Sequence, residues 1–267
     1  MSSQAYFVRK EYSGLKEFTL DLPHKFEERG STIKDNRNVI KKITTTYGSV
    51  VVKDFRGMYF FNRLAYSFFR KSKAERSFIN SGILNDRGID TPPHISWLNC
   101  YNGGLLTKSY FVSIDYPFKT LEQFLNTEID ESNRSRLIHD LAVFTKTMHS
   151  RDIYHKDFSV GNILVIPKDA GFHFALVDLN RVRFLTVTFK DGIRNFNTLA
   201  LPRDVMNEFI EKYAKLFNES PQAAVQMFWN YKNRASKFWR FRKSLRRYTL
   251  TPLEKLAGSI KKSLKGV

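Results

Sequence analysis

The sequence predicts an α+β protein of two lobes, a small N-terminal lobe built on a β-sheet and a mainly helical C-terminal lobe. Three observations support this prediction. Two β-branched runs flank a Tyr-Gly turn in the first quarter of the chain, helical apolar periodicity marks residues 132–150, and a polar loop joins that helix to an apolar strand. The 267 residues can hold two modest lobes or one large domain.

The polar loop has the most specific pattern in the chain. It reads His155-x-Asp157, four further residues and Asn162, and then continues into an apolar strand. Phosphoryl transfer needs a carboxylate that orients the attacking hydroxyl and accepts its proton, and it needs oxygen ligands for the magnesium that neutralises the phosphates. We therefore predict that Asp157 is catalytic and that Asn162 is a magnesium ligand.

Two residues elsewhere complete this pattern. The apolar run 174–177 ends in Asp178, which is placed to be a second magnesium ligand, and the β-branched run 50–52 ends in Lys53, as expected of a lysine that pairs with the phosphates of ATP. A single His-x-Asp triplet is common, whereas four elements in this order are hard to explain by chance.

These motifs give the chain a recognisable likeness. Over about residues 25–200 it resembles the protein-kinase-like superfamily, and most closely the bacterial lipopolysaccharide kinase (Kdo/WaaP-type) family. The resemblance implies a two-lobed protein-kinase-like fold that uses ATP and Mg²⁺. It also implies that His155 has a structural role, packing behind the metal-binding segment.

The N-terminal lobe is predicted from its strands. Residues 38–46 and 49–55 are expected to form a hairpin that turns at Tyr47-Gly48. Ahead of it, Gly30 and Ser31 are candidates for a loop that covers the phosphates of ATP through backbone amides. An ordinary turn between strands fits this stretch, with its single glycine, equally well.

A helix is expected over about residues 72–84, where apolar residues recur on one face. It carries Glu75, the only glutamate between Lys53 and the second lobe. We predict that Glu75 pairs with Lys53 and holds it against the phosphates, as kinase activity requires.

The boundary between the lobes is expected after a strand at 110–114, where a kinase hinge would fall. Asp115 and Tyr116 are predicted to bind adenine through backbone groups. The predicted divisions are an ATP-binding lobe at 1–115, a catalytic lobe at 116–231 and a basic tail at 232–267.

Two positions near the catalytic loop depart from protein kinases or remain open. Asp178 is followed by Leu-Asn-Arg instead of Phe-Gly, which argues against an in/out switch there but leaves metal binding intact. Lys156, beside Asp157, is a candidate to contact the γ-phosphate or an anionic acceptor, and a solvated loop lysine fits it equally well.

The charge of the chain is strongly positive and uneven. Its 44 Lys and Arg against 26 Asp and Glu give +18, which is compatible with nucleic acid, an anionic membrane surface or phosphorylated substrates. Residues 232–247 hold eight basic residues with aromatic residues among them and no acidic residue. If helical, this segment is expected to lie on an anionic membrane surface. A solvated basic face and nucleic-acid binding are the alternatives.

The functional expectation combines these patterns with the resemblance. The lone Cys100, the absence of a signal-like start and the lack of a long apolar run predict a cytoplasmic protein. The resemblance implies transfer of the γ-phosphoryl group of ATP to a lipid-linked or small sugar of the lipopolysaccharide inner core (Kdo or heptose) at the cytoplasmic face of the inner membrane. A protein or small-metabolite kinase and a non-catalytic kinase-like binding protein remain the alternatives.

Overall fold

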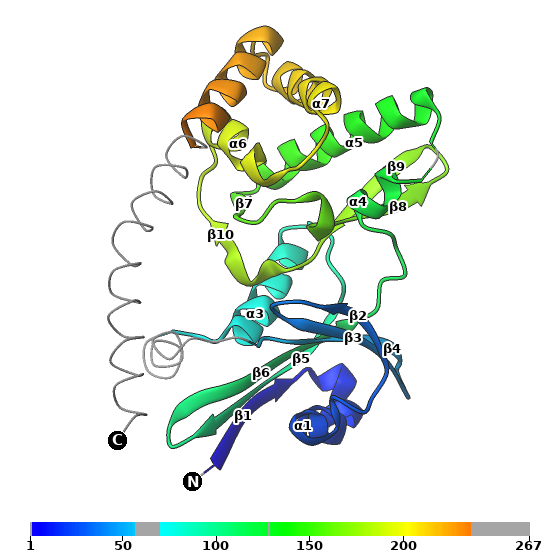
Figure 1. The fold of residues 1–267 in the computed structure, drawn as a ribbon, viewed down its shortest axis with the longest axis vertical. Helices are drawn as coiled ribbons and strands as arrows, with labels where there is room; N and C mark the ends of the chain where they lie inside the picture. The colour runs from blue at the N-terminus through cyan, green and yellow to red at the C-terminus, as the bar shows by residue number, and fades with distance from the viewer. Residues whose placement is uncertain (1, 57–69, 128, 236–267) are drawn as a thin grey trace, which may run out of the picture.

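The computed structural model describes residues 2–56, 70–127 and 129–235. Its N-terminal part is an antiparallel sheet in the order β1-β5-β6-β4-β3-β2. The strands are β1 (Ser2–Val8), β2 (Ser31–Asp35), β3 (Val39–Thr45), β4 (Gly48–Asp54), β5 (His94–Asn102) and β6 (Leu105–Ile114). The sheet lies at one end of the molecule and the C-terminal helices lie at the other (Figure 1).

The predicted hairpin is confirmed. Strands β3 and β4 pair antiparallel, with Thr45 opposite Gly48 at the turn. Gly48 has φ +90°, a conformation that L side chains rarely adopt, so the turn requires the glycine that the sequence supplies.

The sheet packs against two helices. The 3₁₀ turn η1 (Lys10–Leu15) and helix α1 (Lys16–Lys25) form a core with alternate residues of the strands, among them Val50 and Val52 of β4. Helix α3 (Lys73–Asp86) packs against β5 and β6 and carries the predicted 72–84 segment. Because side chains alternate along a strand, Val51 and Lys53 point away from the α1 core.

The C-terminal part is built around the long helix α5 (Glu131–Ser150), which covers the helix predicted at 132–150. Leu137, Leu141 and Met148 are fully buried, and Phe144 packs against Phe174, so the predicted apolar stripe is core. The other elements are α4 (Leu121–Leu125), β7 (Ile153–His155), η2 (Val160–Asn162), β8 (Ile163–Lys168), β9 (Gly171–Leu176), η3 (Leu179–Arg181), β10 (Val182–Phe184), α6 (Phe189–Asn195), η4 (Phe196–Thr198) and α7 (Arg203–Leu216). Residues 221–235 are also helical.

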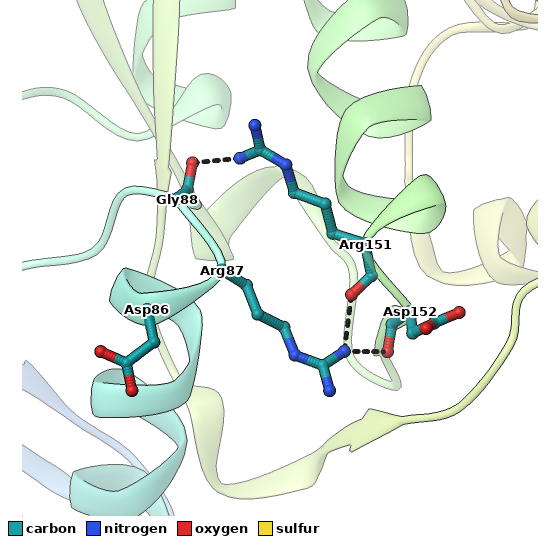
Figure 2. A pocket seen from close by; sticks show the side chains of 5 residues that line it. All are labelled: Asp86, Arg87, Gly88, Arg151 and Asp152. Carbon is teal, nitrogen blue, oxygen red and sulfur yellow. Dashed lines mark hydrogen bonds between the residues drawn. The ribbon is translucent and has the colours of Figure 1, made fainter.

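The ends of α3 and α5 are joined by a reciprocal pair of arginines, which we call the arginine latch (Figure 2). Arg87 donates from Nη1 to the carbonyl oxygens of Arg151 at 2.6 Å and Asp152 at 3.2 Å, and Arg151 donates from Nη1 to the carbonyl oxygen of Gly88 at 2.5 Å. Each guanidinium thereby satisfies carbonyls at the end of the other helix. Gly88 has φ +66°, and a Cβ there would lie 2.7 Å from Nη1 of Arg151.

In the parts of the chain that the structure describes, no helix combines the length and the apolar character needed to cross a membrane.

Candidate active site

A cleft of about 750 Å³ lies between the sheet and the helical part of the molecule. Its walls come from the β2–β3 turn, the exposed face of β4 and β6, the segment after β6, the catalytic loop and the segment after β9. The predicted site residues that line it are Lys53, Asp115, Tyr116, Asn162 and Asp178.

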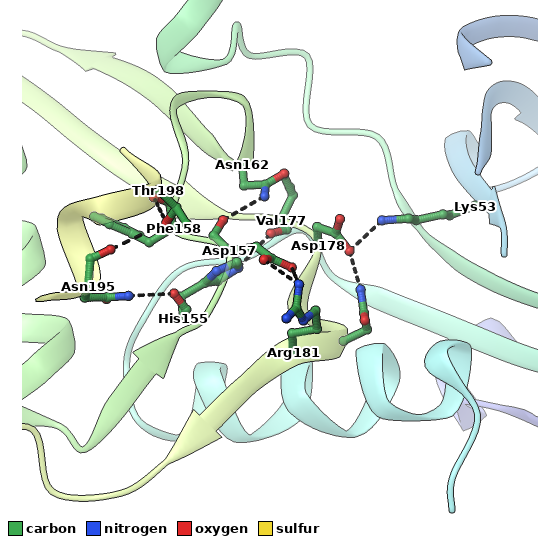
Figure 3. A network of polar contacts seen from close by, with 11 residues as sticks. Lys53, His155, Asp157, Phe158, Asn162, Val177, Asp178, Arg181, Asn195 and Thr198 are labelled. Carbon is green, nitrogen blue, oxygen red and sulfur yellow. Dashed lines mark hydrogen bonds and ion pairs between the residues drawn. The ribbon is translucent and has the colours of Figure 1, made fainter. Parts of the chain in front are cut away.

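Lys53 and Asp178 meet inside this cleft (Figure 3). Nζ of Lys53 lies 2.6 Å from Oδ1 of Asp178, and only 10% of the lysine side chain is exposed. Asp178 has a left-handed backbone, with φ +59°, and Nδ2 of Asn180 also donates to its Oδ1. Burial alone would raise the pKa of Asp178, but the charge and hydrogen bond of Lys53 outweigh burial and lower that pKa. The carboxylate is therefore held in its charged form.

The predicted catalytic loop, residues 155–162, is held in place by Asn162. Its Nδ2 donates to the carbonyl oxygen of Asp157 at 2.8 Å, and its backbone N–H donates to the carbonyl oxygen of Ser159 at 2.9 Å. The amide of Asn162 thus fixes the backbone of Asp157 while keeping Oδ1 as an acceptor.

The carboxylate of Asp157 is contacted by Arg181. Nη1 of the arginine lies 2.8 Å from Oδ1 and 3.0 Å from Oδ2 (Figure 3). The sequence shows Arg181 three residues after Asp178 but contains no signal that assigns it to Asp157. The strand pairing that brings the two segments together supplies that information.

His155 has the structural role that was expected of it. It is fully buried, its Nε2 donates to the carbonyl oxygen of Val177 at 3.1 Å, and burial lowers its pKa. The ring is therefore neutral and ties the catalytic loop to the residue before Asp178. A general-base role is excluded by its burial.

Behind the loop, a buried chain of side chains continues this support. Asn195 donates from Nδ2 to the carbonyl oxygen of His155 at 2.9 Å, and its Oδ1 lies 3.1 Å from Nε2 of His149. Because Oδ1 of Asn195 can only accept, Nε2 of His149 must be the donor. Nδ1 of His149 then accepts a hydrogen bond from the hydroxyl of Tyr213 at 2.8 Å. Burial lowers the pKa of His149 to about 4, which agrees with a neutral ring. No local motif in the sequence indicates this series of buried hydrogen bonds.

The predicted pairing of Glu75 with Lys53 is wrong in this structure. Oε1 of Glu75 accepts from Lys71 at 2.7 Å, and Lys53 pairs with Asp178 instead. Glu75 lies in the first turn of α3, where the helix dipole favours a carboxylate. Helix α3 is linked to the segment that carries Asp178 by another residue, Asn80, whose Nδ2 donates to the carbonyl oxygen of Leu179 at 2.7 Å.

Gly30 and Ser31 do not line the cleft. They lie at the start of β2, where Gly30 has φ +67° and a Cβ would collide with the carbonyl oxygen of Lys42. This geometry fits the alternative prediction, an ordinary turn that leads into a strand. The turn that faces the cleft is the opposite end of the β2–β3 hairpin, residues 36–38. This polar turn, Asn-Arg-Asn, contains no glycine, and sequence reasoning missed it.

Asp115 and Tyr116 follow β6 at the edge of the cleft. Oδ2 of Asp115 lies 2.6 Å from Nζ of Lys42, and its backbone N–H donates to the carbonyl oxygen of Ser49. The hydroxyl of Tyr116 lies 3.4 Å from Oδ1 of Asp90. These contacts fix the segment between the sheet and α4, where adenine binding was predicted.

Further positive charge gathers near Lys53. The pKa of Lys73 is lowered first by burial and then by the charges of Arg37 and Lys53, while Asp178 raises it. A group of cations around one carboxylate favours an anionic ligand. In the sequence Arg37 lies 16 positions before Lys53 and Lys73 lies 20 positions after it, each outside the strand that carries Lys53, so no local motif indicates that they meet.

Two side chains of the cleft were predicted to bind a metal ion. Across residues 2–56, 70–127 and 129–235, no group of three or more His, Cys, Asp or Glu is arranged to hold a metal ion. Asn162 and Asp178 are the oxygen-bearing side chains predicted for that role, and both line the cleft.

Most of the predicted membrane-binding segment, from residue 236 onward, lies outside the described residues. Within the described part, Lys232 lies over the rings of Phe228 and Trp229, with its Nζ 5.3 Å from each centroid.

Comparisons with known proteins agree with this geometry. The model of the lipopolysaccharide kinase (Kdo/WaaP) family matches residues 38–219. The chain is also similar to a solved structure described as "WaaP in complex with acyl carrier protein", with a TM-score of 0.58 at 15% identity, over 87% of this chain and 98% of that one. At this identity the likeness concerns the fold. No curated protein matches the sequence.

Proposed function

Because this chain belongs to the lipopolysaccharide kinase (Kdo/WaaP) family, we propose that it transfers the γ-phosphoryl group of ATP to a hydroxyl of an inner-core sugar, Kdo or heptose. The predicted family and the two-lobed kinase-like fold are both confirmed. Membership supports a phosphotransferase; the donor, the acceptor and the residue roles that follow are our proposal.

One observation carries the proposal. Lys53 from the sheet, Asp178 from the segment after β9 and Asn162 from the catalytic loop converge in one cleft, with Asp157 held beside them. Phosphoryl transfer depends mainly on positioning and on charge stabilisation, and this arrangement offers both.

The nucleotide would lie along the cleft. Its adenine would contact the backbone at Asp115 and Tyr116, and its phosphates would lie near Lys53, Lys73 and Arg37, where the positive charge gathers. Lys53 would exchange part of its contact with Asp178 for the phosphate oxygens.

The residues present fit Mg²⁺, which prefers oxygen ligands and keeps several sites for water and phosphate. The contacts of Lys53 and Asn180 with Asp178 both fall on Oδ1, which leaves Oδ2 as a ligand, and Asn162 offers its own Oδ1. When bound, the ion would neutralise charge on the phosphates. The lowered pKa of Asp178 keeps that ligand ionised.

The reaction itself would depend on Asp157. Its carboxylate would orient the sugar hydroxyl and take its proton as the oxygen bonds to the γ-phosphorus, while the bond to the β-phosphate oxygen breaks and ADP leaves. His155 and Asn162 would hold the loop that presents Asp157, and neither would exchange a proton with the acceptor.

A direct assay tests this function. Purified protein, Mg²⁺ and γ-labelled ATP are incubated with a lipid-linked inner-core acceptor, and the sugar is analysed for added phosphate. We expect label on the sugar with the wild type and none with Asp157→Asn, whereas ATP binding is retained by both. Label on peptide or small-metabolite acceptors, with none on the sugar, would favour the alternative kinases. ATP binding without transfer of phosphate to any acceptor would favour the alternative of a non-catalytic, kinase-like binding protein.

The basic tail would bring the enzyme to a lipid-borne acceptor at the cytoplasmic membrane face. The test variant replaces five basic residues by Gln: Arg240, Arg242, Lys243, Arg246 and Arg247. At about 1 kcal/mol for each of the five charges near an anionic surface, the partition coefficient should fall by roughly three to four orders of magnitude. Sedimentation with anionic vesicles measures this, and unchanged binding would reject the role. DNA or RNA binding that the variant loses would favour the nucleic-acid alternative.

A further inference from the structure

The side of Asp157 that carries Arg181 has a second group of cations. Strand β10 pairs antiparallel with β7, so that Val182 lies opposite His155 and Arg183 lies opposite Tyr154. Arg181 ends the 3₁₀ turn η3 directly before β10, and Arg183 lies within the strand; both arginines are exposed, whereas Val182 between them is buried. Lys156 follows directly after His155 and lies half-buried beside them.

These charges act on one another. The pKa of Lys156 is lowered, first by burial and then by the positive charges of Arg183 and Arg181, with a further contribution from Arg70. Asp157 is the opposing negative charge in this group. Four cations and one carboxylate leave an excess of positive charge next to the catalytic aspartate, which favours the binding of an anion there.

Arg181 has the geometry to bind such an anion. Its contact with Asp157 uses Nη1, and 55% of its side chain is exposed. A guanidinium carries five N–H donors in a planar fork that matches a carboxylate or a phosphate. An anion bound by the other nitrogens would lie close to any hydroxyl that reaches Asp157.

Building on the proposed sugar-kinase function, we propose that Lys156, Arg181 and Arg183 form a subsite for a negatively charged group of the acceptor itself. The acceptor is then an anionic sugar, with its carboxylate or phosphate a few bonds from the hydroxyl that is phosphorylated. A neutral sugar would leave the subsite unfilled. Of the two proposed acceptors, Kdo, which is a sugar acid, satisfies this requirement without prior modification, whereas heptose does so only if it already carries a phosphate.

The test compares acceptors that differ only in charge. Kdo is compared with its carboxamide, and heptose with heptose phosphate, as acceptors for labelled ATP. Within the pair of acceptors that the enzyme phosphorylates, we expect kcat/KM to be about 10- to 100-fold higher for the charged member. Preference for Kdo over its carboxamide identifies a carboxylate as the ligand, and preference for heptose phosphate identifies a phosphate. Equal rates within both pairs would overturn the proposal while leaving the sugar kinase intact.

Variants assign the preference to the subsite. Lys156→Gln and Arg183→Gln should each reduce the charged-to-neutral ratio by about tenfold, mostly through the charged acceptor. Lys168→Gln is the matched control, because Lys168 is an exposed lysine at the end of the β8–β9 hairpin, opposite Gly171. If the variants raise KM for ATP equally with both acceptors and keep the ratio, the cations serve the nucleotide and the proposal fails.

A binding measurement separates this proposal from the proposed function. Calorimetry with Kdo and its carboxamide, in the presence of a non-hydrolysable ATP analogue, needs no catalysis. Tighter binding of Kdo that Arg183→Gln removes would support the subsite even if no sugar is phosphorylated. Equal binding of Kdo and its carboxamide, together with equal binding of heptose phosphate and heptose in the same titrations, would overturn it, and a thermal melt confirms that each variant is folded.

Discussion

Replacing Asn195 by Leu should uncouple the catalytic loop from the helices behind it. Asn195 is buried, and it accepts from His149 while it donates to the carbonyl oxygen of His155. Leucine has similar bulk but no polar atoms, so the substitution leaves one buried donor and one buried acceptor without partners.

The expected cost follows from these two groups. Each unsatisfied buried group costs about 1–3 kcal/mol, so the free energy of unfolding should fall by about 2–6 kcal/mol. Activity should fall as well, because the carbonyl that loses its donor belongs to the histidine two residues before Asp157. The second effect should appear in kcat, since Asn195 does not line the nucleotide cleft.

The assay is urea denaturation followed by circular dichroism, with phosphoryl transfer measured on the same preparations. Asn85→Leu is the control, because Asn85 is an exposed asparagine near the end of α3, and it should change the free energy of unfolding by less than about 0.5 kcal/mol. A free energy for Asn195→Leu within that same margin of wild type would refute the reasoning. Full activity at wild-type stability would show that the buried chain does not support the loop.

Three further results are expected. Asp157→Ala should abolish transfer yet bind ATP with nearly unchanged affinity by calorimetry, because Asp157 acts on the acceptor; turnover equal to wild type would reject its role. A double-mutant cycle on unfolding should give a coupling of about 1–3 kcal/mol for Lys53 and Asp178, and near additivity for Lys53 and Glu75. His149 has a pKa of about 4 in the fold against 6.5 ordinarily, so the unfolded chain takes up its proton first. As the pH falls from 6.5 to 4, the free energy of unfolding should therefore decrease by up to about 3 kcal/mol. In denaturation measured as a function of pH, His149→Gln should not show this decrease.

The sequence was most informative where the residues of a predicted site lie close together in the chain or directly follow a recognisable strand. Asp157 and Asn162 lie five residues apart on one loop, and Lys53 and Asp178 each follow an apolar run. These residues could therefore be proposed as site residues without knowing the fold. Lys53 also depends on strand alternation, and the β-branched run before it indicated that alternation.

The failures concern contacts that depend on long-range placement. Gly30 and Ser31 were predicted to lie either in a loop that covers the phosphates or in an ordinary turn between strands, and the register of the β2–β3 hairpin puts the other end of that hairpin at the cleft. The pairing of Glu75 depends on where the start of α3 lies relative to β4. Arg181 and Asn195 reach the catalytic loop from 24 and 40 residues downstream, and nothing in their immediate neighbourhood shows it.

The arginine latch restrains the C-terminal end of α3 against the end of α5. Because that end is held, a tilt of the helix about it would displace the opposite end most, at Lys73 near the cations around Lys53. At 1.5 Å per residue, α3 is about 21 Å long, and a rotation of about 10° at the latch would move its free end by about 4 Å. Asn80 lies about midway and would move by about 2 Å, which is enough to break its hydrogen bond with Leu179. Small rotations at the latch would thus be amplified at Lys73, and the Asn80 contact is the restraint that they would have to release.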